Sequence, residues 1–130
     1  MNTLNVLIAV DVEAALAASS LEDAIYFVDT NGYLGSWQEG TNTLNSVCQD
    51  GQLISWSAAP VNAGDAVVIA GFGGDAVSQR ICVPAPDPFQ GDAVWNARVE
   101  AQGSYASLAY TVTLGLGGAQ LGASAFLKVV

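Results

Sequence analysis

The sequence predicts an all-β protein, an antiparallel β-sandwich of jelly-roll type with about nine strands. Turn-forming residues interrupt the chain at intervals that suit strands joined by hairpins and are mostly too short for helical crossovers. Between the turns, apolar and polar side chains alternate with the period of a half-buried strand. The turn signals are Asn31-Gly32, Asp50-Gly51, Gly64-Asp65, Gly73-Gly74, Pro84 to Pro88 with Gly91, Gly103 and Gly117-Gly118.

The strand pattern is clearest in residues 105–116, whose even-numbered side chains form an apolar face. Alternation also places Trp56 on the apolar face of 52–57 and Trp95 on that of 93–101, so both indoles are expected in the core. Segment 66–72 is apolar throughout, which predicts a central strand covered on both faces. The other predicted strands are 3–10, 24–29, 44–48, 77–83 and 125–130.

Residues 11–20 interrupt the alternation. They are rich in Ala and begin with Asp11, a residue type that caps helix N-termini, so a short helix or a compact loop is expected after the first strand. The chain has 130 residues, and no repeat or linker divides it. We therefore expect one β-sandwich domain over residues 1–130.

The charge balance narrows the classes of partner and of chemistry. Three basic residues stand against twelve acidic ones, for a net charge of -9 and a pI near 4.1. Nucleic acid and anionic membranes need clustered Lys and Arg, so neither is expected as a partner. The chain has no His, which excludes conventional Ser-His or Cys-His catalysis. No catalytic residues and no enzymatic activity are predicted.

The placement of the acidic residues predicts self-association. Most of them fall at turns, which leaves sheet faces of small and uncharged side chains. Two copies of such a face meet with little charge to desolvate, so the expected partner is a second copy of the chain, in a homo-oligomer. Association is expected to strengthen as the pH falls towards the pI.

Cys48 and Cys82 are the only thiols. Two reduced, buried thiols are favoured over a disulfide, which remains the alternative. The first residues lack the basic leading region of a signal peptide, and Asp11 and Glu13 interrupt their apolar run. The prediction is a cytoplasmic protein, with release without a cleaved signal as the alternative.

A ligand site is predicted around Trp37, which lies between turns next to polar side chains. Sugar-binding proteins stack an aromatic ring on the sugar and bind its hydroxyls with polar groups. With Asp29, Asn31, Tyr33 and Glu39, Trp37 makes a candidate carbohydrate site. The alternative is that Trp37 covers one end of the core.

A calcium site is a weaker prediction for the same region. Asp29 and Asn31 can present a carboxylate and an amide oxygen, which suit Ca²⁺. The closing Glu of an EF-hand loop is absent, and Asn31-Gly32 is equally typical of a hairpin turn. No cofactor other than calcium is expected.

Five segments of the chain share the pattern of a known family; they are Leu4 to Asp11 with Glu13, Tyr26-Phe27-Val28, Gly51 to Trp56, Gly64-Asp65 and Tyr110 to Val130. Together they resemble the AidA/PixA inclusion-body family of bacterial proteins. The resemblance implies a cytoplasmic β-sandwich, made under density or stage control in host-associated bacteria and able to accumulate in inclusions. It brings no catalytic residues. A lectin-like role is compatible with the family, but no binding residues are carried over by motif.

Overall fold

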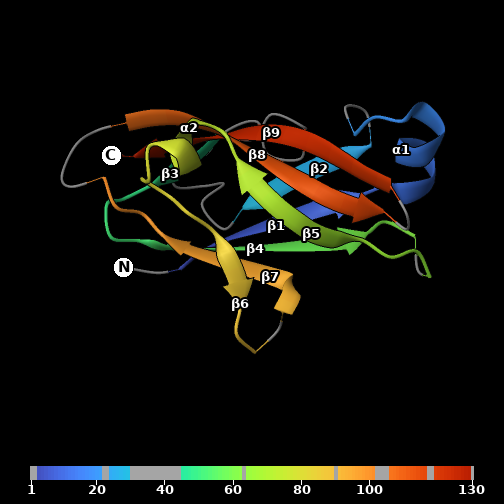
Figure 1. The fold of residues 1–130 in the computed structure, drawn as a ribbon, viewed down its shortest axis with the longest axis horizontal. Coiled ribbons are helices and arrows are strands. Elements are labelled where there is room, and N and C mark those ends of the chain that lie inside the picture. The colour runs from blue at the N-terminus through green and yellow to red at the C-terminus, as the bar shows by residue number, and fades with distance from the viewer. Residues whose placement is uncertain are drawn as a thin grey trace.

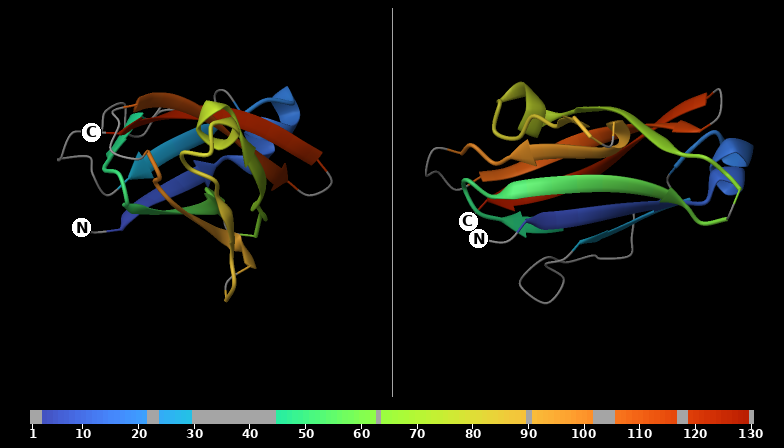
Figure 2. Two further views of the ribbon diagram at one scale, coloured as in Figure 1. Left: turned by 60° about the vertical axis from the view of Figure 1, so that its left-hand side comes forward. Right: turned by 90° about the horizontal axis from the view of Figure 1, so that it is seen from below.

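The computed structural model describes residues 3–21, 24–29, 45–62, 64–89, 91–101, 106–116 and 119–129. Over these ranges the chain forms nine strands and two short helices, and the strands make two sheets packed face to face (Figure 1). In the left view of Figure 2, the orange-red and red strands Ala106–Leu116 and Ala119–Val129 of one sheet form a layer over the blue strand Leu4–Val10 and the green strand Leu53–Pro60 of the other. The predicted all-β sandwich is confirmed.

One sheet has five strands and the other has four. The five-stranded sheet has the order β2 (Ile25–Asp29), β1 (Leu4–Val10), β4 (Leu53–Pro60), β7 (Gly91–Arg98) and β6 (Ala85–Asp87). The four-stranded sheet has the order β3 (Asn45–Cys48), β9 (Ala119–Val129), β8 (Ala106–Leu116) and β5 (Val68–Gly73).

The core lies between the sheets and is filled by the faces that alternation predicts. In β1 the residues from Leu4 to Val10 alternate between buried and more exposed positions. Trp56 and Tyr110 are the largest fully buried side chains, from β4 and β8 respectively. Trp95 is partly buried and packs against this core. The predicted inward positions of both indoles are therefore confirmed.

The expectation of wholly antiparallel sheets is wrong at two places. β1 pairs in parallel with β4, and β3 pairs in parallel with β9. After β2 the chain next contributes a strand to the four-stranded sheet, β3, and then returns to the first sheet as β4. Such crossings between sheets, and not hairpin turns, decide the direction in which β4 meets β1.

Segment 66–72 contains an edge strand and not a central one. Its strand, β5, pairs only with β8 in the sheet order, and Val68 is 46% exposed. An apolar run predicts burial on both faces only if neighbouring strands and the second layer cover it. Here the run lies at the rim of the sheet, and three of its seven residues are Ala or Gly.

Segment 77–83 does not form the predicted strand. Helix α2 (Asp75–Ser78) and turns occupy this region instead. The helix follows Gly74, whose φ is 89°. A Cβ at Gly74 would lie 2.9 Å from the Cα of Tyr110, so only glycine allows α2 to start this close to β8.

β6 was not expected, because its prolines indicated a turn. Pro86 lacks an N–H group, and β6 accordingly lies at the end of the sheet order, where one side needs no hydrogen bonds. The predicted short helix is confirmed as α1 (Val12–Ala18), with the Asp11 carboxylate accepting a hydrogen bond from the Ala14 N–H at 3.2 Å. Among the described residues, neither helix has the length and apolar character to cross a bilayer.

Candidate functional site

Four of the five predicted ligand residues, Trp37, Asn31, Tyr33 and Glu39, lie outside the described residues. The fifth, Asp29, is the last residue of β2 and is buried. Its Oδ2 accepts a hydrogen bond of 2.6 Å from the Ser46 hydroxyl of β3. This contact joins the edge strands of the two sheets, so the structure places the Asp29 carboxylate inside the sandwich.

The calcium site stays a prediction. Asn31, the second proposed ligand, is among the residues that the structure does not describe. Over the described ranges, no group of three or more Cys, Asp or Glu side chains is placed to hold a metal ion. Within the described residues, the Asp29 carboxylate therefore belongs to no group of acidic side chains that could hold the ion.

A buried polar cluster surrounds Tyr110. Its hydroxyl accepts a hydrogen bond from the Trp56 indole N–H at 3.3 Å. Burial raises the pKa of Tyr110 well above its usual range. The hydrogen bond from Trp56 opposes this shift, whereas the nearby Cys82, Asp29 and Cys48 add to it. The phenol is therefore held neutral between the sheets.

Cys48 and Cys82 belong to the same cluster, and both thiols are free and buried, as expected. Burial raises the pKa of each thiol to about 12, from an ordinary value of 9.0. The Cys48 thiol donates a weak hydrogen bond to the Lys128 carbonyl at 3.7 Å. Because a thiol reacts as its thiolate, these two groups are poor nucleophiles near neutral pH. The buried polar cluster is suited to packing and not to chemistry.

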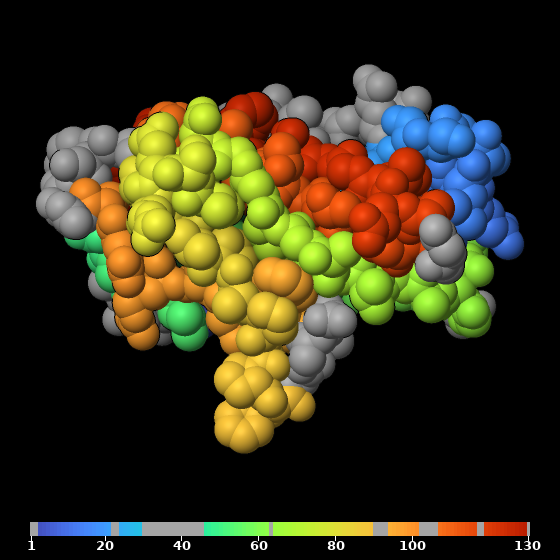
Figure 3. All heavy atoms as spheres, in the orientation of Figure 1, coloured from blue at the N-terminus to red at the C-terminus, as the bar shows by residue number. Residues whose placement is uncertain are grey.

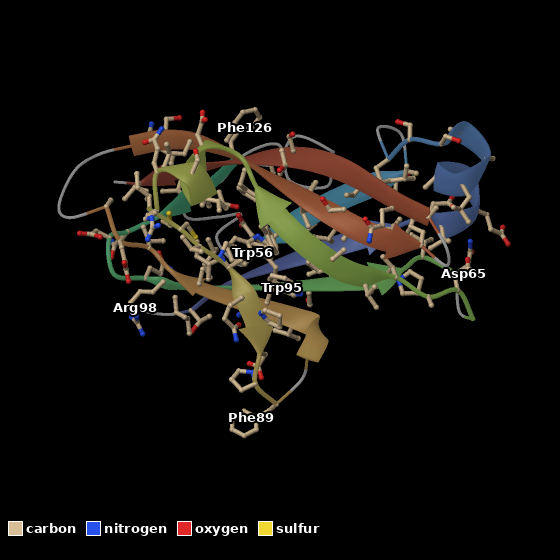
Figure 4. The ribbon with its side chains drawn as sticks, in the orientation of Figure 1. Trp56, Asp65, Phe89, Trp95, Arg98 and Phe126 are labelled. Carbon is tan, nitrogen blue, oxygen red and sulfur yellow. The ribbon has the colours of Figure 1, made fainter. Side chains whose placement is uncertain are left out.

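Aromatic rings continue the core from the β2–β3 edge towards the edge formed by β5 and β6. The ring centroids of Trp56 and Phe72 are 5.0 Å apart, and those of Phe72 and Trp95 are 5.5 Å apart. Figure 4 shows Trp56 and Trp95 following one another in this direction. The Trp95 indole N–H is buried without a hydrogen-bond partner among the described residues. This edge is therefore held by ring packing.

The outer face of the five-stranded sheet is uncharged over its central rows. In one row Leu7 of β1 stands between Val28 of β2 and Ser57 of β4, and Ser57 is followed by Val94 of β7. Leu7 is 40% exposed, and Tyr26 in the next row is 42% exposed. We name these side chains the β1 outer face; its members are Asn5, Leu7, Ala9, Tyr26, Val28, Ser55, Ser57, Ala59, Val94 and Asn96.

Sequence reasoning missed Phe89, the most exposed large apolar side chain among the described residues. It lies where the chain turns between β6 and β7. The signal was an aromatic residue inside a cluster of Pro, Asp and Gly, because such a turn offers no core face to bury it.

Comparison with known proteins assigns the chain to a family. The family described as "Domain of unknown function (DUF8788)" matches residues 2–122. This chain belongs to the DUF8788 family. No curated protein matches the DUF8788 chain.

Among solved structures, the DUF8788 chain is similar to the inclusion body protein PixA from Burkholderia cenocepacia J2315. The TM-score is 0.69 at 12% sequence identity, over 99% of this chain and 96% of that one. The two proteins therefore share a fold over their whole lengths. The resemblance to the AidA/PixA family is confirmed at the level of the fold.

Proposed function

We propose that this DUF8788 protein is a non-enzymatic, self-associating β-sandwich of the inclusion-body type, acting in bacterial physiology linked to hosts or population density. The observation that carries the proposal is the uncharged β1 outer face, with Leu7 and Tyr26 each about two fifths exposed. The shared fold with an inclusion body protein supports it.

Contact between two such faces buries apolar surface and removes few charged groups from water. Charged groups cost free energy when they leave water, and the central rows of the β1 outer face contain none. Burying Leu7 and Tyr26 removes apolar surface from water, which favours contact. The net charge of -9 opposes contact between copies at neutral pH, and this repulsion disappears near pH 4.1.

The first prediction concerns assembly and its place on the surface. We expect oligomers in size-exclusion chromatography with light scattering, and scattering that rises as the pH falls from about 7 to about 4.5. Leu7→Lys should weaken assembly, because it places a charge in the β1 outer face. Leu16→Lys is the matched control: Leu16 is 44% exposed on α1, and the change in net charge is the same.

A strict monomer at high concentration whose scattering stays flat on acidification would contradict self-association. Equal assembly of the Leu7→Lys and Leu16→Lys proteins would contradict the β1 outer face as the place of contact. Circular dichroism of both variants checks that the sandwich is retained.

The alternative function is a carbohydrate-binding, lectin-like module, with or without calcium. It rests on the sequence around Trp37, whose polar neighbours suit a sugar platform. A glycan array with and without chelator separates the two proposals. Binding that is lost in Trp37→Ala favours the lectin, and a blank array in both conditions rejects it.

A further inference from the structure

The tip of the β6–β7 hairpin presents one aromatic side chain to solvent. Phe89 is 97% exposed, far more than any other large apolar side chain of the described residues. Figure 3 shows the yellow and orange tip standing out from the body of the molecule, and Figure 4 shows the Phe89 ring at its extremity. The ring takes no part in the core of the described residues, so the packing of this part of the chain does not explain an apolar group in this place.

The tip is held in one shape before any partner arrives. The Asp87 carboxylate accepts a hydrogen bond from the Phe89 backbone N–H at 2.8 Å. Its other oxygen accepts one from the Asn96 side chain of β7 at 2.7 Å. Pro86 and Pro88 restrict the backbone on both sides of Asp87. These restraints reduce the backbone freedom that is lost when Phe89 is bound.

A pocket that could accept an aromatic ring lies beside α2. Its volume is about 530 Å³, and it is lined by Val77, Arg80, Val83 and Glu100. Val83 is 52% exposed, so the pocket offers apolar wall to a ring. Arg80 adopts a φ of 58°, which a residue with a side chain adopts rarely. Its guanidinium can stack on an aromatic face.

We propose that Phe89 of one copy inserts into this α2 pocket of a second copy. The proposal rests on the proposed self-association and adds a contact separate from the β1 outer face. Residues 85–92 contain two Asp and no basic residue, and the pocket contains Arg80, one of three basic residues in the chain, together with Glu100. A hairpin without Lys or Arg is poorly suited to an anionic membrane, which leaves the second copy as the better occupant.

The donor and the acceptor of the contact lie at different places on one copy. In Figure 1, α2 lies in the upper part of the molecule and the hairpin tip at the lower margin. Each copy can therefore donate its Phe89 to one neighbour and accept that of another, a head-to-tail arrangement that gives a ring or an open chain. One inserted side chain buries much less surface than a stable dimer needs. We expect this contact to act at high protein concentration, where many copies meet.

The test uses the whole chain with one variant for each side of the contact. Phe89→Ser removes the ring, and Val83→Glu places a second carboxylate in the pocket with Glu100. Each variant should raise the concentration for half-maximal light scattering by about tenfold or more. Both residues are exposed, so the fold should be retained, and circular dichroism checks this. Phe126→Ser, on the outer face of the four-stranded sheet, makes the same change elsewhere and should leave the concentration unchanged.

A mixture of the two variants distinguishes head-to-tail insertion from contact between two tips. The Val83→Glu copy retains its Phe89, and the Phe89→Ser copy retains its pocket. Both variants are made in the Leu7→Lys background, which weakens the β1 outer face. At high concentration, an equimolar mixture should then have a higher weight-average mass in analytical ultracentrifugation than either variant alone. Contact between two Phe89 rings would leave the mixture no heavier than the Val83→Glu protein alone and would overturn the proposal.

Three other outcomes also overturn the insertion. The first is that Phe89→Ser leaves assembly unchanged while Leu7→Lys weakens assembly; this result leaves the proposed function intact. The second is unchanged assembly of Val83→Glu. The third is Phe89-dependent binding to vesicles of neutral lipid with unchanged self-assembly, which would make the lipid surface the partner. A strictly monomeric wild-type protein would contradict the proposed function itself.

Discussion

The two long edges of the sandwich are built in opposite ways. Between β2 and β3, the Ser46 hydroxyl and the Asp29 carboxylate meet inside the protein at 2.6 Å. On the other side, rings of β5 and β7 pack at 5.5 Å, and the neighbouring hairpin extends Phe89 into solvent. The first edge pairs its polar groups within the chain, and the second leaves apolar surface that a partner can cover.

The β2–β3 edge therefore contributes to the stability of the fold, whereas the hairpin edge is available for interaction. A buried carboxylate without a partner costs free energy, so substitutions at the β2–β3 edge should appear as loss of stability. An exposed ring makes no comparable contribution to folding, so substitutions at the hairpin should appear only in assembly. The remaining predictions test this separation, beginning with the largest effect.

Alkaline pH should destabilise the cluster behind the β2–β3 edge. Burial raises the pKa of the Cys48 and Cys82 thiols to about 12, so these groups stay protonated in the folded protein while the unfolded chain loses their protons near pH 9. The favourable contribution is complete below about pH 9 and is lost as the pH rises towards 12. At about pH 10 the loss should be about 3 kcal/mol for the two thiols together.

Denaturant unfolding at a series of pH values measures this loss. The double variant Cys48→Ala, Cys82→Ala is the control, because it removes both thiols from the titration. Its stability should fall less steeply between about pH 9 and about pH 10. Identical slopes for the two proteins would show that the thiols are not responsible.

Ser46→Val should destabilise the protein by about 2 kcal/mol, because it removes the hydroxyl that donates to the buried Asp29 carboxylate. Ser46→Thr retains the hydroxyl and should cost less. Denaturant unfolding at neutral pH compares the two variants. Equal losses would mean that side-chain volume, and not the hydrogen bond, sets the cost.

Trp56→Phe should destabilise the protein by about 1–2 kcal/mol, because the indole is buried and donates to Tyr110. Trp95→Phe makes the same substitution at the position paired with Trp56 and should cost about 0.5 kcal/mol or less, because it also removes a buried N–H without a partner. Thermal or denaturant unfolding measures both. A larger loss for Trp95→Phe would indicate that its N–H is satisfied in solution.

Local chemistry explains which parts of this architecture were predictable. The cap at Asp11 and the inward faces of β1 and β8 depend on neighbouring residues, and these predictions agree with the structure. The segment after Gly74 was mistaken for a strand because its apolar residues also suit a short helix that packs on a sheet. Of the candidate ligand site, only Asp29 can be compared with the structure, and its partner Ser46 lies 17 positions away.

The sequence by itself determined the all-β class, the side chains that face the core, the strongly negative charge and the lack of histidine. These properties follow from composition and from the period of two along each strand. Only the tertiary structure decided that β4 and β9 have parallel partners, that β5 is an edge, that Asp29 points inward and that Phe89 projects outward. Strand order and edge position arise from contacts between segments distant in sequence, so the local pattern of residues does not predict them.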